Sequence, residues 1–92
     1  MIKLALIGCG KWGRHYLKTL TTIKGCALKW VCDLDFKKVK EIISDYPQVK
    51  YTENIDDILN DSSISGVVIA TTPESHFCLA KEFIMKGKSV LV

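Results

Sequence analysis

The feature that most constrains the fold is a regular alternation of short apolar runs with segments of helical periodicity. The runs Lys3–Ile7, Ala27–Cys32 and Gly66–Thr71 are mostly apolar, which is typical of strands buried on both faces. Between these runs, apolar residues recur every three or four positions, as in amphipathic helices. The order β-α-β-α-β-α-β-α-β predicts a parallel sheet with helices on both faces.

The topology of such a chain follows from the handedness of its crossovers. Right-handed crossovers give a Rossmann-type, doubly wound α/β sheet with strand order 3-2-1-4-5. A ligand then binds between the carboxyl ends of the first and fourth strands. The remaining predicted elements are helices from Lys11 to near Gly25, from Phe36 to before Pro47, after the N-cap Asn54, and from Pro73 to Gly87, with strands at Val49–Tyr51 and Ser89–Val92.

Charge and length exclude several classes of protein. With 92 residues the chain forms one domain, and its net charge of +3 is too small to indicate a nucleic-acid or membrane partner. Residues 1–50 hold 10 Lys and Arg against 4 Asp and Glu, whereas residues 51–92 hold 3 against 6. This asymmetry indicates that the first half prefers anions.

The cysteines and the first residues indicate a compartment. Cys9, Cys26, Cys32 and Cys78 form no C-x-x-C pair, and only two histidines are available as further metal ligands. No basic leader and no apolar run of about 18 residues is found. We therefore expect a cytoplasmic protein with free thiols and no metal.

A G-x-G-x-x-G pattern lies between the first predicted strand and the first predicted helix. Gly8 permits a tight turn, Gly10 lets the backbone approach a pyrophosphate, and Gly13 lets the helix pack closely on the sheet. The amides of Lys11 and Trp12 then bind the anion at the helix N-terminus. The alternative is a glycine-rich turn that binds nothing.

An acidic residue at the end of the second strand supports the dinucleotide interpretation. Asp33 lies where a carboxylate accepts hydrogen bonds from an adenosine ribose diol. A carboxylate repels a 2′-phosphate, so NAD is favoured over NADP, although Lys37 and Lys38 lie close enough to weaken this preference. Asp33 is alternatively an N-cap of the second helix, a role for which Asp35 is better placed.

The opposite wall of the crevice is predicted to come from the end of the fourth strand. Thr71, Thr72 and Pro73 fall there, with His76 in the first turn of the next helix, where the nicotinamide half of a dinucleotide would lie. In the alternative interpretation Thr72 caps the helix, Pro73 starts it and His76 is a surface imidazole.

These motifs together resemble the N-terminal domain of the glucose–fructose oxidoreductase, inositol dehydrogenase and MocA (Gfo/Idh/MocA) family. The resemblance spans essentially the whole chain. It rests on Gly8-Cys9-Gly10-Lys11-Trp12-Gly13, Val31-Cys32-Asp33-Leu34-Asp35, Val67–Pro73 with His76, and Gly87–Val92.

The resemblance implies an NAD(P)-dependent oxidoreductase that transfers hydride between a nicotinamide cofactor and a sugar, nucleotide-sugar or polyol hydroxyl. The Trp12 version of the loop is most similar to members that process nucleotide sugars. The cofactor-groove positions that the resemblance carries over are Lys11, Trp12, Asp33, Thr71, Thr72, Pro73 and His76.

The family also implies parts that residues 1–92 do not contain. Family members continue from the fifth strand into a Glu-Lys-Pro motif, a sixth strand and a second α+β domain that supplies most of the substrate pocket. We therefore expect an incomplete NAD(P)-binding Rossmann domain with no catalytic residue except the candidate His76, inactive on its own. The edge strand ending in Val90-Leu91-Val92 is expected to promote self-association.

Two other functions fit parts of the sequence. One is a stand-alone regulatory module that senses NAD without catalysis. The other is an S-adenosylmethionine-dependent methyltransferase, because that class also pairs a glycine loop with an acidic strand end. Gly13 and the Thr71-Thr72-Pro73 segment fit the methyltransferase class less well.

Overall fold

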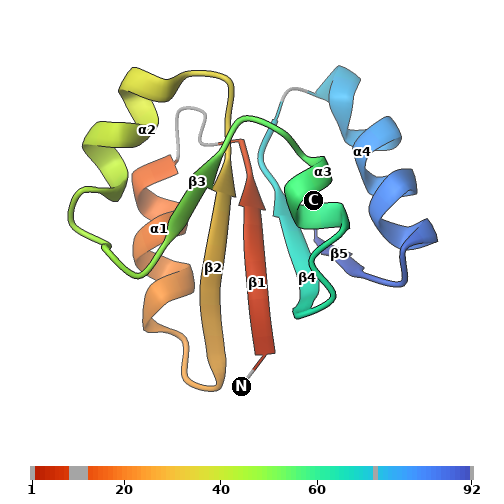
Figure 1. Cartoon of the computed structure of the whole chain (residues 1–92), viewed down its shortest axis with the longest axis horizontal. Helices are drawn as coiled ribbons and strands as arrows, with labels where there is room; N and C mark the ends of the chain where they lie inside the picture. Colours follow the sequence, from red (N-terminus) through yellow and green to blue (C-terminus); the bar gives the residue numbers. More distant parts are fainter. Residues whose placement is uncertain (1, 9–12, 72, 92) are drawn as a thin grey trace.

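The computed structural model of the chain describes residues 2–8, 13–71 and 73–91 (Figure 1). Its five strands form one parallel sheet in the order β3-β2-β1-β4-β5, which confirms the predicted fold class and strand order. The strands are β1 (Ile2–Ile7), β2 (Cys26–Cys32), β3 (Lys50–Thr52), β4 (Ile64–Ile69) and β5 (Ser89–Leu91). The helices are α1 (Gly13–Thr22), α2 (Phe36–Ile43), α3 (Asp56–Leu59) and α4 (Pro73–Met85).

The helices cover both faces of the sheet, with α1 and α2 on one face and α3 and α4 on the other (Figure 1). Adjacent strand residues point to opposite faces. Leu6 therefore packs in the core that contains Leu17 of α1, while its neighbour Ile7 packs in the core that contains Ile58 of α3 and Phe83 of α4. Both cores surround β1, which is the central strand.

Strand β4 begins and ends two residues earlier than the predicted range Gly66–Thr71. Its pairing with β1 ends where Ile69 lies opposite Ile7, the last residue of that strand. The Ala70 amide still donates to the Ile7 carbonyl at 2.8 Å. Because β1 has ended by this point, Thr71 lies beyond the sheet, in the loop that precedes α4.

The spacing of Phe77, Ala80 and Ile84 in the sequence predicts that Ile84 faces the core, and helix α4 shows that this prediction is wrong. Phe83 is fully buried in the core, whereas Ile84 is 60% exposed and Met85 is 76% exposed. Successive residues of a helix are about 100° apart, so the helix that directs Phe83 toward the sheet directs Ile84 away from it. Within the described part of the chain, no helix is both long enough and apolar enough to cross a membrane.

The described cysteines Cys26, Cys32 and Cys78 carry free thiols, as expected. Cys9 lies outside the described residues. In residues 2–8, 13–71 and 73–91, no three His, Cys, Asp or Glu side chains are grouped in a way that would hold a metal ion.

Candidate functional site

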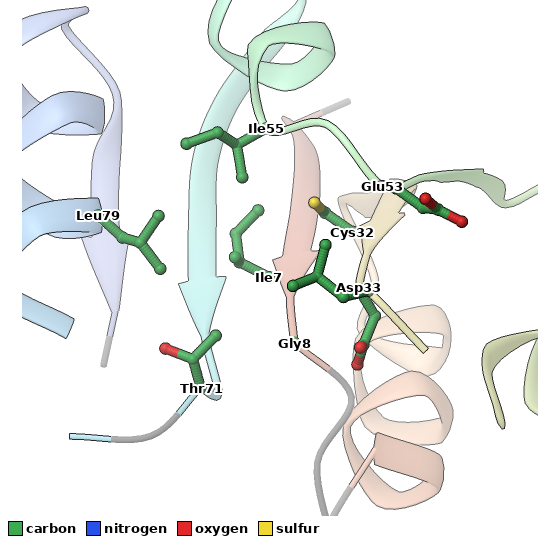
Figure 2. A pocket seen from close by; sticks show the side chains of 9 residues that line it. Ile7, Gly8, Cys32, Asp33, Glu53, Ile55, Thr71 and Leu79 are labelled. Atoms are coloured by element: carbon green, nitrogen blue, oxygen red, sulfur yellow. The ribbon is translucent and has the colours of Figure 1, made fainter. Parts of the chain in front are cut away.

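A cavity of about 290 Å³ lies at the carboxyl edge of the sheet (Figure 2). It is lined by Ile7 and Gly8 at the end of β1, by Cys32–Leu34 at the end of β2, and by Thr71 after β4. The chain after β1 and β2 enters helices on one face, whereas the chain after β4 enters α4 on the other face. The cavity therefore lies at the reversal of strand order, where ligands bind in sheets of this type.

Gly8 lies at this edge, close to the end of β4. Its φ is +84°, and a Cβ at this position would lie 2.7 Å from Thr71 Cγ2 and 3.2 Å from the carbonyl carbon of Ala70. Its amide donates to the Cys32 carbonyl at 2.6 Å. Glycine is therefore required twice, by the left-handed backbone and by the close approach of the chain to the end of β4.

Asp33 lines the cavity and also supports the turn into α2. Its carboxylate Oδ1 accepts a hydrogen bond from the Asp35 amide at 2.9 Å. The Asp35 carbonyl in turn accepts the Val39 amide at 3.1 Å, which starts the helix. Asp33 is therefore not the N-cap of α2, because the first helical hydrogen bond starts at Asp35; its carboxylate instead holds the turn before the helix and lines the cavity.

Two neutral groups close to Asp33 are affected by its negative charge. Burial is the main cause that raises the pKa of the Cys32 thiol to about 11, and the carboxylates of Asp33 and Asp57 add to it. Burial likewise raises the pKa of the Tyr51 hydroxyl to about 12, with further contributions from Glu53 and Asp33. Both groups therefore remain protonated at neutral pH, and Cys32 is not a reactive thiolate.

The cavity has an apolar side and an acidic side. Figure 2 shows Leu79 and Ile55 on the side of β4 and Asp33 and Glu53 on the side of β2. Leu34, which also lines the cavity, is 84% exposed. A cavity with an apolar side and a carboxylate edge suits a ligand that carries both an aromatic ring and hydroxyl groups.

The structure brings three of the predicted site residues together at the cavity: Gly8, Asp33 and Thr71. Gly13 and Pro73 are the first residues of α1 and α4, and the backbone of His76 lies in the first turn of α4. Lys37 is exposed on α2. Four predicted binding residues lie outside the described residues: Gly10, Lys11, Trp12 and Thr72.

The sequence interpretation missed the lining residues that come from later elements: Glu53, Ile55 and Leu79. One signal was available for Glu53. It follows the third predicted strand, and all strands of a parallel sheet end at the same edge.

Comparisons with known proteins cover the entire described fold. An oxidoreductase family with an NAD-binding Rossmann fold matches residues 2–92. The uncharacterized oxidoreductase YhhX of Escherichia coli (strain K12) is 33% identical over 96 residues, which cover 100% of this chain and 27% of YhhX. Inositol 2-dehydrogenase 2 of Saccharopolyspora erythraea is 26% identical, with 98% of this chain and 27% of that protein covered.

A solved structure adds a bound cofactor to the comparison. The crystal structure of GenD2 from gentamicin A biosynthesis, in complex with NAD, superposes with a TM-score of 0.88 and 27% identity. The match covers 97% of this chain and 25% of GenD2. The chain thus spans about a quarter of the length of the relatives that it matches.

Proposed function

Because this chain belongs to the Gfo/Idh/MocA family of oxidoreductases, as an NAD-binding Rossmann domain of that family, we propose that its cavity holds the adenosine half of NAD. The observation that carries the proposal is that Gly8, with its left-handed backbone, and the carboxylate of Asp33 line one cavity at the switch point of the sheet. The residues present fit the group. Asp33 would accept the ribose hydroxyls, while Leu34 and Ile55 offer apolar surface to the base.

We propose that the parent protein transfers hydride between the nicotinamide of this cofactor and a hydroxyl-bearing carbon of a sugar, nucleotide sugar or polyol. The cofactor supplies the hydride chemistry when bound. The part of this chain is to orient the cofactor: the glycine-rich segment at the pyrophosphate, Asp33 at the ribose, and Thr71, Thr72, Pro73 and His76 beside the nicotinamide. No catalytic residue is assigned within residues 1–92.

Two features favour NAD over the alternatives. Asp33 at the rim of the cavity disfavours the 2′-phosphate of NADP. The match of residues 2–92 to an oxidoreductase family favours a dinucleotide over S-adenosylmethionine. A non-catalytic NAD sensor makes the same binding prediction, and turnover of a polyol panel by the longer parent protein would separate it from a dehydrogenase.

Isothermal titration with NADH tests the proposal. We expect saturable binding by the wild-type chain, and binding weakened about tenfold or more by Asp33→Asn, because a neutral amide accepts weaker hydrogen bonds from the ribose than a carboxylate does. S-adenosylmethionine should not compete with NADH. Absence of saturable binding at millimolar NADH would overturn the proposal.

We further propose that copies of this chain associate through β5. This strand is an edge of the five-stranded sheet, and its Leu91 is 66% exposed. An edge strand with exposed apolar residues presents free backbone groups to another chain. Sedimentation velocity should show oligomers that increase with concentration, whereas a single monomer species at millimolar concentration would contradict this proposal.

A further inference from the structure

We infer that Glu53 is a second specificity-determining residue of the dinucleotide site, which disfavours a 2′-phosphate from the same rim as Asp33. The inference rests on the proposed function, because it concerns the choice between two forms of the proposed cofactor. Glu53 lines the cavity together with Asp33, although the two residues are 20 positions apart in the sequence. Figure 2 shows both side chains on the β2 side of the cavity.

The sheet places these two residues side by side. Strands β2 and β3 run parallel, and their last residues, Cys32 and Thr52, pair in register. The residue that follows each strand is acidic. The Asp33 amide donates to the Thr52 carbonyl at 3.2 Å, which continues the pairing by one step. The backbones of Asp33 and Glu53 are therefore held at neighbouring positions of the same edge.

Side chains on both sides of Glu53 hold this arrangement. The Tyr51 hydroxyl donates to the Asp33 carbonyl at 2.8 Å, which connects the end of β3 to the end of β2. The Thr52 hydroxyl accepts the Asn54 amide at 3.1 Å and donates to the carboxylate of Asp57. Because its neighbours are held in place, the backbone of Glu53 stays beside the rim while its side chain is exposed.

The charged side chains described at this rim are all negative. Among the described lining residues, the charged side chains are Asp33 and Glu53, and both are acidic. The raised pKa of Tyr51, to which Glu53 and Asp33 both contribute, is consistent with a negative potential here. NADP carries a 2′-phosphate with about two negative charges where NAD has a hydroxyl. A second carboxylate therefore penalises NADP much more than NAD.

The test compares the affinities of NADH and NADPH by fluorescence titration for the wild-type chain, Glu53→Gln and Glu82→Gln. Glu82 is an exposed carboxylate on α4 and is not among the described lining residues, so its variant makes the same charge change outside the lining of the cavity. We expect Glu53→Gln to lower the ratio Kd(NADPH)/Kd(NADH) about three- to tenfold at low salt. A repulsion of this size is typical of a carboxylate and a phosphate that are partly screened by solvent. Glu82→Gln should leave the ratio unchanged.

Salt provides a readout that a purely structural role would not produce. The effect of Glu53→Gln should shrink as the ionic strength rises to about 0.5 M, because dissolved ions screen the interaction between exposed charges. Glu53→Lys should lower the ratio further than Glu53→Gln. In the wild-type chain the ratio should also fall as salt increases, through Asp33 and Glu53 together, so the weaker salt dependence of Glu53→Gln and Glu53→Lys is the part that reports on Glu53.

The outcomes separate this inference from the proposed function. Wild-type binding of NADH with an unchanged ratio in Glu53→Gln and Glu53→Lys would overturn the inference and leave the proposed function in place. A wild-type ratio that is independent of salt would count against it in the same way. Failure of the wild-type chain to bind either nucleotide would instead overturn the proposed function.

Discussion

At Gly8 the backbone has a φ of +84°, and a Cβ would lie 2.7 Å from Thr71 Cγ2. The glycine pattern predicted this turn, and the structure adds that the turn presses against the end of β4. Asp33 was also predicted from its place after the second strand. The sequence alone did not show that its carboxylate accepts the Asp35 amide as well. That hydrogen bond depends on local backbone geometry that a pattern of residue types does not specify.

Gly8→Ala should lower the free energy of unfolding by roughly 2–4 kcal/mol, because a left-handed alanine is strained and its methyl group meets Thr71. Gly25→Ala is a matched control, since Gly25 has a φ of +82° but a Cβ added there would meet nothing within 4 Å among the described residues. It should cost only about 1 kcal/mol. Urea unfolding measures both values. Equal losses would show that the approach of Gly8 to β4 is not tight.

At the level of elements, contacts near the start of β4 stabilise the sheet, whereas the carboxyl ends of the strands form the cavity. Near the start of β4, the Lys88 ammonium donates to the carbonyls of Asp61 and Ile64 at 2.8 and 3.0 Å. The Asp61 carboxylate accepts Trp30 Nε1 at 2.9 Å and pairs with Lys29 Nζ at 2.7 Å. These contacts join β2, β4 and the start of β5, while the carboxyl ends of the strands form the cavity.

Asp61 should make stability depend on pH. Hydrogen bonds from Lys29, and then from Ser63 and Trp30, hold the pKa of its carboxyl well below the usual range. A depressed carboxyl pKa stabilises the fold above the unfolded-state value of about 3.9, and this contribution is lost as the pH falls below it.

The measurement is the difference in unfolding free energy between the wild-type chain and Asp61→Asn. We expect about 1–3 kcal/mol at pH 7, and a smaller difference as the pH is lowered from 5 toward 2. Asp45→Asn, at an exposed position after α2, is the matched control. A difference for Asp61→Asn that stays constant over this pH range would contradict the assigned interactions.

The element order could be predicted from the sequence because each strand and helix has its own apolar period. Helix α4 shows where this fails. Both Phe83 and Ile84 are apolar, so periodicity alone did not identify the buried one, and packing against the sheet decides it. Glu53 was missed for a related reason. Its proximity to Asp33 comes from the pairing of β2 with β3, which is a tertiary contact.

For the whole molecule, the binding of a cofactor and its use in catalysis are separate questions. The described residues of this chain form the cavity, whereas the chain covers only 27% of YhhX. The surface of α4 and β5 also carries exposed apolar side chains, namely Ile84, Met85 and Leu91. None of these three residues is among the described residues that line the cavity, so ligand binding and association should be measurable independently.

The central claim is that NAD binds at the carboxyl edge of the sheet, and amide chemical shifts during a titration with NAD test it most directly. We expect the largest shift changes at Gly8, Asp33, Leu34, Glu53 and Thr71, and small changes at Ile84 and Met85. Changes centred on the outer surface of α4, or no changes at millimolar NAD, would contradict the claim.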